Sequence, residues 1–360
     1  MRKYIYGVIS SSKPVTLGQS LLSSSPEEVY TVVQRDLAGV VSNYSAGDFA
    51  SLSKEDKLRC LMAHQEVIER VMKEGYTILP VKFGTMVEDE DEIRRILEQG
   101  YNKFAQTLDR MDGLVEIEVA ATWDLKEVLE EIGNEAEIRQ LKHSMAGKST
   151  AEILEIQINA GKLVKESLDR RREGYRSQIM QSLAEVSLDI QPNALVADEM
   201  VMNVAFLIQR EKQEDFDRQV KRVDEAFNDQ INFRVIGPLP PYSFSTVEIR
   251  RPEPGEIEEA RQLLGLGTDV SDKELKEAYR HLAAKSHPDA HPDDDARDEQ
   301  FVKVREAFVL LRDYCQGQSE SESVEENVNG RRYSLMPEYV NQAYLVEIKR
   351  PALQTAGVLG

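Results

Sequence analysis

Apolar and polar positions change their spacing repeatedly along the first 121 residues, and this predicts a sheet flanked by helices. Apolar or alternating runs at 4–9, 77–84 and 114–121 have strand character, and 28–35 and 40–44 look like a short hairpin around 37–39. Between these runs, apolar residues three and four apart predict amphipathic helices over 54–73 and 88–111. Interleaved strands and helices of this kind indicate an α+β sheet with helices on one face.

The next stretch repeats the pattern in a more regular order. A long charged helix is followed by two strands, a second helix and a closing strand, at 150–183, 185–190, 200–208, 215–228 and 231–236. With 114–121 as the opening strand, the order is β-α-β-β-α-β, which is the ferredoxin-like order. We therefore predict two tandem ferredoxin-like α+β units, residues 1–113 and 114–250, of which the first is less regular.

Residues 256–316 show a purely helical pattern with a turn in the middle. Ser271 and Glu274 form a capping-box signature at a helix start. The apolar stripe of this helix is spaced i, i+3, i+4 and i+7 and consists of Leu275, Ala278, Tyr279 and Leu282. The apolar face of the returning helix consists of Phe301, Val304, Phe308, Leu311 and Cys315. Together with a shorter leading helix over 257–264, these segments predict a small all-α domain built on a helical hairpin.

The turn of this hairpin contains His287, Pro288 and Asp289. Pro288 cannot continue a helix and biases His287 away from helical dihedrals, so the chain turns here. Basic residues three and four apart form a ridge on the side of the first helix opposite to the apolar stripe: Lys273, Lys276 and Arg280. A turn of this composition and a basic solvated face are each common in proteins. Their combination with two complementary apolar faces is distinctive.

This combination resembles a J-domain, the module that docks on a DnaK-type chaperone and stimulates its ATPase. The resemblance implies that His287, Pro288 and Asp289 carry the stimulation. It also implies that the first helix docks on an acidic surface of the chaperone. The residues implied in this docking are Lys276, Tyr279, Arg280 and Lys285.

Two features depart from the J-domain pattern. Ser286 stands where many J-domains have an aromatic residue, and a second His-Pro-Asp follows at 291–293. Alignment with both helices favours the first copy, residues 287–289, as the J-domain motif. His287 and His291 are four residues apart with carboxylates nearby, but the two prolines break the helix that would bring both rings to one face. We therefore predict no metal site, and no segment indicates a bound cofactor.

Three segments carry a second resemblance, at 4–8, 79–85 and 234–244. The most specific piece is Gly-Pro-Leu-Pro-Pro-Tyr-Ser-Phe at 237–244. These segments are similar to the GvpL/GvpF family of gas vesicle proteins, and the resemblance covers about residues 1–250. It implies an accessory protein of gas vesicle formation that binds the small, apolar structural subunit of the vesicle wall, and not an enzyme.

Composition narrows the function further. The chain has 360 residues and a formal net charge of −19, which disfavours nucleic acid and anionic membranes as partners because both would repel it. No stretch approaches the roughly 20 apolar residues of a membrane helix. The two cysteines, Cys60 and Cys315, fall on predicted apolar helix faces, which is typical of a reduced cytoplasmic protein. Among the 64 acidic residues no catalytic constellation is recognisable.

The C-terminal part has two compositions. Residues 317–330 are rich in Ser and Glu and are predicted to form a disordered acidic linker. Residues 331–360 form a tail in which 344–348 has strand character. This run either adds a strand to one of the sheets or contacts a client, and the sequence leaves both uses open.

The sequence as a whole predicts a cytoplasmic assembly protein that is associated with the gas vesicle. Its partners are the wall subunit, other gas vesicle accessory proteins and a DnaK-type chaperone, which it recruits through residues 256–316. The alternative is a minor structural component of the shell whose J-like hairpin lacks chaperone-stimulating activity. An enzyme is the least favoured class.

Overall fold

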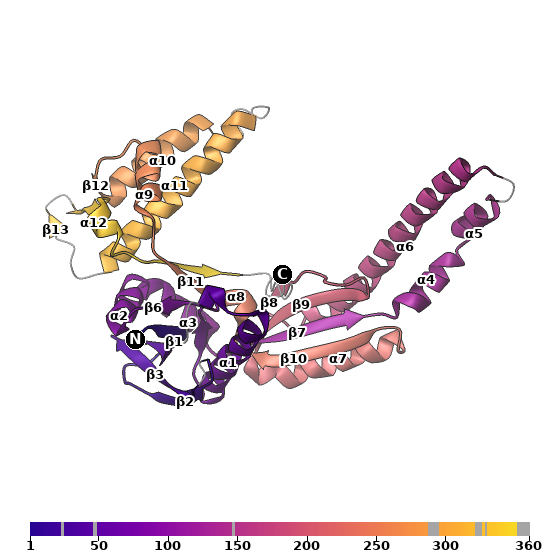
Figure 1. Ribbon diagram of the computed structural model, residues 1–360, viewed down its shortest axis with the longest axis horizontal. Helices are drawn as coiled ribbons and strands as arrows, with labels where there is room; N and C mark the ends of the chain where they lie inside the picture. The colour runs from indigo at the N-terminus through magenta and orange to yellow at the C-terminus, as the bar shows by residue number, and fades with distance from the viewer. Residues whose placement is uncertain are drawn as a thin grey trace. The chain divides into compact units, whose positions relative to one another are not determined.

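The computed structural model of the chain describes residues 1–22, 25–45, 49–145, 148–286, 295–320, 326–327 and 330–350. These residues fall into two compact units (Figure 1). The first unit contains residues 1–112 and 245–349, and the second contains residues 113–244 together with Arg350. The first unit is thus built from two segments that are distant in sequence.

The N-terminal part of the first unit is an antiparallel sheet with the strand order β2-β3-β4-β1-β5, and β6 pairs with β1 as well. Its strands are β1 (Lys3–Ser10), β2 (Thr16–Ser20), β3 (Glu27–Gln34), β4 (Leu37–Asn43), β5 (Ile78–Pro80) and β6 (Met86–Val87). Its helical segments are η1 (Phe49–Ser51), α1 (Lys54–Lys73), α2 (Glu90–Gln99) and α3 (Tyr101–Met111).

The ferredoxin-like prediction is wrong for this part of the chain. Four strands precede α1, whereas the β-α-β-β-α-β order requires a helix after the first strand. The prediction of helices on one face only is also wrong, because every residue from Tyr4 to Ile9 in β1 is buried. A strand that is apolar and buried along its whole length is covered on both faces.

The second unit is built on an antiparallel sheet with the order β10-β7-β9-β8. Its strands are β7 (Leu114–Thr122), β8 (Asp189–Pro192), β9 (Met200–Gln209) and β10 (Asn232–Leu239). Its helical segments are α4 (Leu125–Gly133), α5 (Ala136–His143), α6 (Thr150–Ala184), η2 (Arg210–Lys212), α7 (Gln213–Phe227) and α8 (Tyr242–Ser245). The order along the chain is strand, helices, strand, strand, helix, strand, as the sequence predicts.

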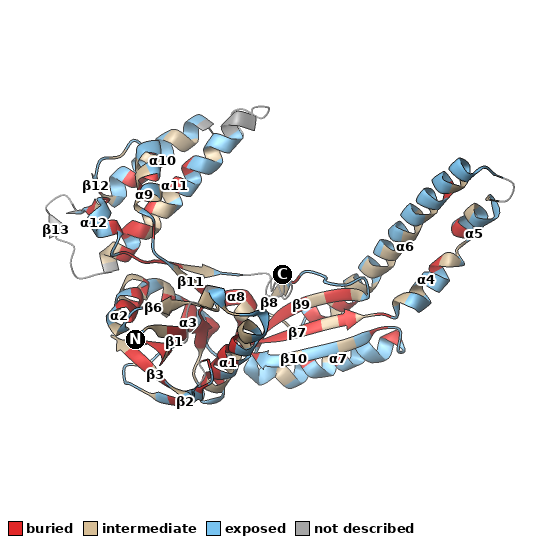
Figure 2. Ribbon diagram, in the orientation of Figure 1, coloured by how far each residue is buried: buried red, intermediate tan, exposed pale blue. Residues whose placement is uncertain are grey.

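The helices α4, α5 and α6 form an elongated hairpin whose surface is largely exposed (Figures 1 and 2). Arg171 on α6 forms ion pairs with Glu131 at 2.6 Å and with Glu135 at 2.9 Å. Ser167 donates a hydrogen bond to the Glu135 carboxylate, whose pKa these partners lower. Few apolar side chains are buried in this hairpin, and Ile132 is one of them. The polar pairs therefore contribute much to how its helices are aligned with one another.

The C-terminal part of the first unit contains the three helices that the sequence predicts between residues 256 and 316. They are α9 (Pro254–Leu263), α10 (Asp272–Ser286) and α11 (Asp295–Glu320), and α10 packs along α11 (Figure 1). The short elements around them are β11 (Thr246–Arg250), β12 (Asp269–Val270), β13 (Glu326–Asn327), β14 (Gly330–Arg331), β15 (Tyr333–Ser334), α12 (Pro337–Val340) and β16 (Leu345–Lys349).

The described part of the C-terminal tail up to Lys349 is part of this domain. β16 pairs antiparallel with β11, and β15 pairs antiparallel with β12. The run 344–348 therefore forms a strand, but this strand belongs to a separate two-stranded sheet with β11 and to neither of the two larger sheets. The predicted acidic linker begins inside α11, which extends to Glu320, and its residues 321–325 and 328–329 lie outside the described part of the chain.

No helix among the residues described combines the length and the apolar character needed to cross a bilayer.

Gly7 in β1 has no room for a side chain, because a Cβ atom there would lie 2.6 Å from Ile78 Cγ1 and 2.7 Å from the Leu79 carbonyl oxygen. We expect Gly7→Ala to lower the free energy of unfolding by about 1–3 kcal/mol, since β5 must shift to relieve the overlap. The control is Gly161→Ala on α6, where nothing lies within 4 Å. It should raise stability by about 0.5–1 kcal/mol. Urea unfolding followed by circular dichroism measures both, and an unchanged midpoint for Gly7→Ala would contradict this account.

Candidate chaperone-docking face

The helix α10 begins at a capping box, as the sequence predicts. The Ser271 backbone N–H and hydroxyl each donate to Glu274 Oε2 at 2.8 Å, and the Glu274 N–H donates to Ser271 Oγ at 3.3 Å. These hydrogen bonds lower the pKa of the Glu274 carboxyl, and Arg332 adds to the effect through an ion pair at 3.1 Å. The start of α10 is therefore fixed by its own sequence and by a residue of the tail.

One side of α10 packs on α11. Leu275 is buried, while Ala278, Tyr279 and Leu282 are half-buried against the same core. The Tyr279 ring stacks on the Phe308 ring with centroids 4.2 Å apart and planes inclined by 19°. This stack places Tyr279 between the two helices and away from the basic ridge.

The other side of α10 presents the basic ridge to solvent. Lys273, Lys276 and Arg280 are all exposed, and Lys273 lies 3.9 Å from Glu277 on the next turn. Arg280 lies about 40° round the helix axis from Lys276, so these two share one face. Lys285 is exposed too, but it lies about 140° round the axis from Arg280. The ridge that the structure brings together therefore contains Lys276 and Arg280 but not Lys285.

The residues His287, Pro288 and Asp289 lie outside the described part of the chain, as do the second His-Pro-Asp at 291–293 and the pair His287 and His291. The described helices end at Ser286 and resume at Asp295, so these residues lie between the two helices that the sequence predicts. Within the described residues, no group of three or more side chains of the metal-ligating types is placed to hold a metal ion.

A second polar site, which the sequence did not indicate, lies under the Pro-rich segment of the second unit. The Glu116 side chain on β7 is completely buried and accepts hydrogen bonds from the Ser243 N–H and the Ser243 hydroxyl, both at 2.8 Å. Burial raises the pKa of Glu116 to about 8, although the bonds from Ser243 oppose the shift. Glu116 stands opposite Leu239, where the pairing of β10 with β7 changes register. The carboxyl group therefore holds the segment 237–244 over the sheet.

The only sequence signal for this site is the position of Glu116 in an apolar strand. The buried face of β7 alternates through Val115, Ile117, Val119 and Ala121, and Glu116 points to the other face. From the sequence, that face is expected to be exposed to solvent, because the segment that covers it, 237–244, follows more than 120 residues later.

The buried Glu116 predicts a pH-dependent stability. Its pKa in the folded state is raised, so its contribution is complete below the usual pKa near 4.5 and is lost as the pH rises through about 8. Relative to Glu116→Gln, the wild-type unit should lose up to roughly 1.4 kcal/mol per pH unit in this window. Trp123 is the only tryptophan of the chain and is buried in this unit, so its fluorescence reports the unfolding transition. The control is Glu127→Gln, at an exposed position. If the difference in the free energy of unfolding between the wild type and Glu116→Gln did not vary with pH, the prediction would be contradicted.

Comparisons with known proteins match two parts of the chain. The family model of gas vesicle synthesis protein GvpL/GvpF matches residues 2–246, and that of the DnaJ domain matches residues 261–316. Gas vesicle protein F of Streptomyces sp. (strain CB03234) is 29% identical over 249 residues, which are 68% of this chain and 99% of that protein. The chaperone protein DnaJ of Herminiimonas arsenicoxydans is 46% identical over 52 residues, 14% of each chain.

The solved structures agree with the first match. The crystal structure of the gas vesicle protein GvpF from Anabaena sp. PCC7120 superposes with a TM-score of 0.58 at 25% identity, covering 67% of this chain and 96% of that one. GvpF from Microcystis aeruginosa gives a TM-score of 0.55 at 21% identity, with 67% and 97% covered, and so shares the fold.

Proposed function

The chain belongs to the GvpL/GvpF family of gas vesicle synthesis proteins and carries a DnaJ domain behind the family region, and we propose that it is an assembly factor that brings a chaperone to a gas vesicle subunit. In this proposal the family region binds the apolar structural subunit of the vesicle wall, together with other gas vesicle accessory proteins. The DnaJ domain recruits a DnaK-type chaperone. The observation that carries the proposal is the presence of both matches in one chain.

The family region spans almost the whole length of its relatives. The alignment with gas vesicle protein F of Streptomyces covers 99% of that protein within 68% of this chain, so the DnaJ domain is an addition to a whole relative. A small apolar wall subunit exposes surface that aggregates before it is assembled, which is the kind of client that chaperones bind. Joining the two functions in one chain raises the local concentration of chaperone at the client.

The proposed roles of the docking residues rest on the J-domain resemblance and, for the residues on α10, on the geometry of this helix. We assign stimulation of the chaperone ATPase to His287, Pro288 and Asp289, and the electrostatic contact with an acidic chaperone surface to Lys276 and Arg280. The exposure of these two cations on one face supports this role, because rim charges steer association.

The other two candidates receive different roles. Tyr279 supports docking indirectly, since its stack on Phe308 fixes α10 against α11. Lys285 lies near the turn on another side of the helix, so its contribution to the ridge is small.

We further propose that the chain acts in the cytoplasm in association with gas vesicles and is not an enzyme. Its relatives are gas vesicle proteins. Cys60 and Cys315 are free and buried, and burial raises the pKa of both thiols, which keeps them protonated and unreactive. On its strand order we also assign the sheet of the second unit to the ferredoxin-like class.

The second candidate function is a minor component of the vesicle shell in which the J-like hairpin is silent. Ser286 in place of an aromatic residue and the acidic run after the second His-Pro-Asp favour this reading. The two candidates differ in chaperone stimulation and share binding to the wall subunit.

Single-turnover ATP hydrolysis by the host DnaK-type protein separates them. We expect the full chain to stimulate hydrolysis and His287→Gln to lose the stimulation, because the substituted turn no longer carries the J-domain imidazole. Both proteins should still co-purify with the wall subunit, which shows that the variant is folded. Equal hydrolysis with and without the wild-type chain would leave the shell component as the better assignment.

The basic ridge gives a matched test of docking. The double change Lys276→Glu and Arg280→Glu should weaken stimulation about ten-fold or more at low salt, because it reverses two charges that face an acidic surface. The same reversal at Lys285 should have a much smaller effect, since this side chain lies off the ridge. ATPase titrations at several salt concentrations measure both. Equal losses for the two variants would show that the ridge is not the docking face.

A further inference from the structure

We infer that residues 332–349 form a clasp that fastens the DnaJ domain to the N-terminal sheet of the first unit, so that a bound chaperone is held at a fixed place beside that sheet. The inference goes beyond the matched DnaJ domain, which ends at residue 316. It rests on the proposed function only for the identity of the bound partner.

The clasp completes the core of the DnaJ domain. Five of its apolar side chains are at most 5% exposed and belong to the same cluster as the helices: Tyr333, Leu335, Val340, Ala343 and Leu345. On the helices, this cluster includes Leu275 of α10 and Leu311 of α11. Fully buried side chains of this size make large favourable contributions, so the segment is a structural part of the domain.

Polar contacts fix the start of the clasp. The Leu335 N–H donates to the Thr268 carbonyl at 2.8 Å, and the Tyr314 hydroxyl donates to the Ser334 carbonyl at 2.7 Å. Arg332 donates to the Asp269 carbonyl at 2.6 Å and pairs with Glu274 at the start of α10. This end of the clasp therefore sets the position of the helix that carries the basic ridge.

The other end of the clasp joins the N-terminal sheet through β11. β16 pairs with β11 from Leu345 opposite Arg250 to Lys349 opposite Thr246. β11 in turn contacts the strand edge next to β5, because the Lys82 N–H donates to the Val247 carbonyl at 2.8 Å. Only residues 251–253 separate β11 from α9, so the described chain contains no long linker between sheet and DnaJ domain.

Two helices of the N-terminal part hold β16 and α11 from the other side. Lys103 on α3 donates to the Val346 carbonyl at 2.8 Å and pairs with Asp313 of α11 at 3.2 Å. The Gln99 side-chain oxygen at the end of α2 accepts a hydrogen bond from the Tyr344 N–H at 2.6 Å. Covering a strand edge in this way also prevents it from pairing with other chains.

Arg251 adds a further connection. Its guanidinium pairs with the buried Glu92 carboxylate of α2 and donates to the Tyr344 hydroxyl at 2.9 Å. The same guanidinium lies 5.2 Å from the centre of the Tyr344 ring, within the range of a cation–π contact. Contacts on both sides of β16 therefore oppose rotation of the DnaJ domain on the sheet.

The basic ridge stays accessible in this arrangement, since Lys276 and Arg280 are exposed while the clasp is closed. A chaperone docked on α10 would thus meet the N-terminal sheet at one defined orientation. A flexible tether would instead distribute it over many positions.

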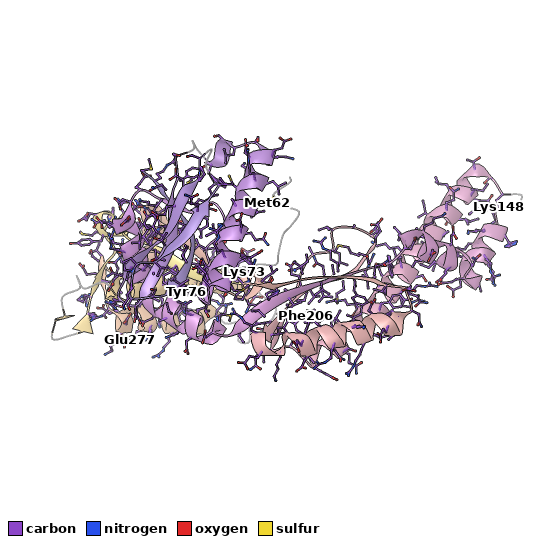
Figure 3. The ribbon with its side chains drawn as sticks, turned by 90° about the horizontal axis from the view of Figure 1, so that it is seen from below. Met62, Lys73, Tyr76, Lys148, Phe206 and Glu277 are labelled. Carbon is purple, nitrogen blue, oxygen red and sulfur yellow. The ribbon has the colours of Figure 1, made fainter. Side chains whose placement is uncertain are left out.

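Distance measurements between spin labels test the clasp in the full chain. The labels are placed at Lys73→Cys on α1 and Glu277→Cys on α10, which are exposed and belong to the two parts that the clasp joins (Figure 3). Cys60 and Cys315 are buried, and the unsubstituted chain gives the background labelling. We expect one narrow distance distribution. A broad distribution in the otherwise unchanged chain would overturn the inference.

A variant that opens the clasp provides the comparison. Gln99→Ala, Lys103→Ala and Arg251→Ala together should broaden the distribution about two-fold or more, while Gln106→Ala with Arg110→Ala, on exposed positions of α3, should leave it unchanged. Equal widths in both variants would also overturn the inference. The opened variant should still stimulate the chaperone ATPase, which shows that its DnaJ domain is folded. A narrow distribution without any stimulation in the parent chain would retain the clasp and reject the proposed function.

Discussion

The pairing of β16 with β11 is the constraint on which the C-terminal half of the first unit depends. It brings Leu345 beside Arg250 and so closes the intervening chain, 251–344, into a loop. Closing a loop of this length costs conformational entropy, which local helix formation does not repay. The buried side chains of Tyr333, Leu335 and Val340 offset that cost by entering the core between α9, α10 and α11. The DnaJ domain and the returning tail therefore stabilise each other.

The sequence could predict the helices of this domain because their signals are local. The capping box of Ser271 and Glu274 and the apolar stripe from Leu275 to Leu282 need only neighbouring residues, and both occur as expected. The return of the tail could not be predicted, because its strand-like runs are short and do not indicate their partners. The run 344–348 showed strand character, but its partner strand lies almost 100 residues earlier.

The two larger sheets also show what local sequence patterns could and could not predict. In the second unit the order of strands and of the two main helices was predictable, but α4, α5 and the burial of Glu116 were not predicted. Its exposed-looking face is covered by Ser243, which arrives with the last segment of the unit. In the first unit β1 is buried on both faces and reads as a plain apolar run. The hairpin expected over 28–35 and 40–44 is present as β3 and β4, and these strands and β2 come between β1 and α1, so the ferredoxin-like order fails there.

The charge of the chain bears on the inferred clasp and on the proposed docking of the chaperone. The protein carries a net charge of −19, yet the ridge around Lys276 and Arg280 is basic. In the proposed docking, an acidic chaperone surface is repelled by the net charge of the molecule and attracted by this basic face. Because charges in solution act over only about 10 Å at 0.1 M salt, attraction requires that this face be presented directly. A freely rotating domain would often turn acidic neighbours toward the approaching partner, whereas a clasped domain keeps the ridge outward at every encounter. An acidic protein with a basic docking face therefore gains more from a rigid attachment than a neutral one would.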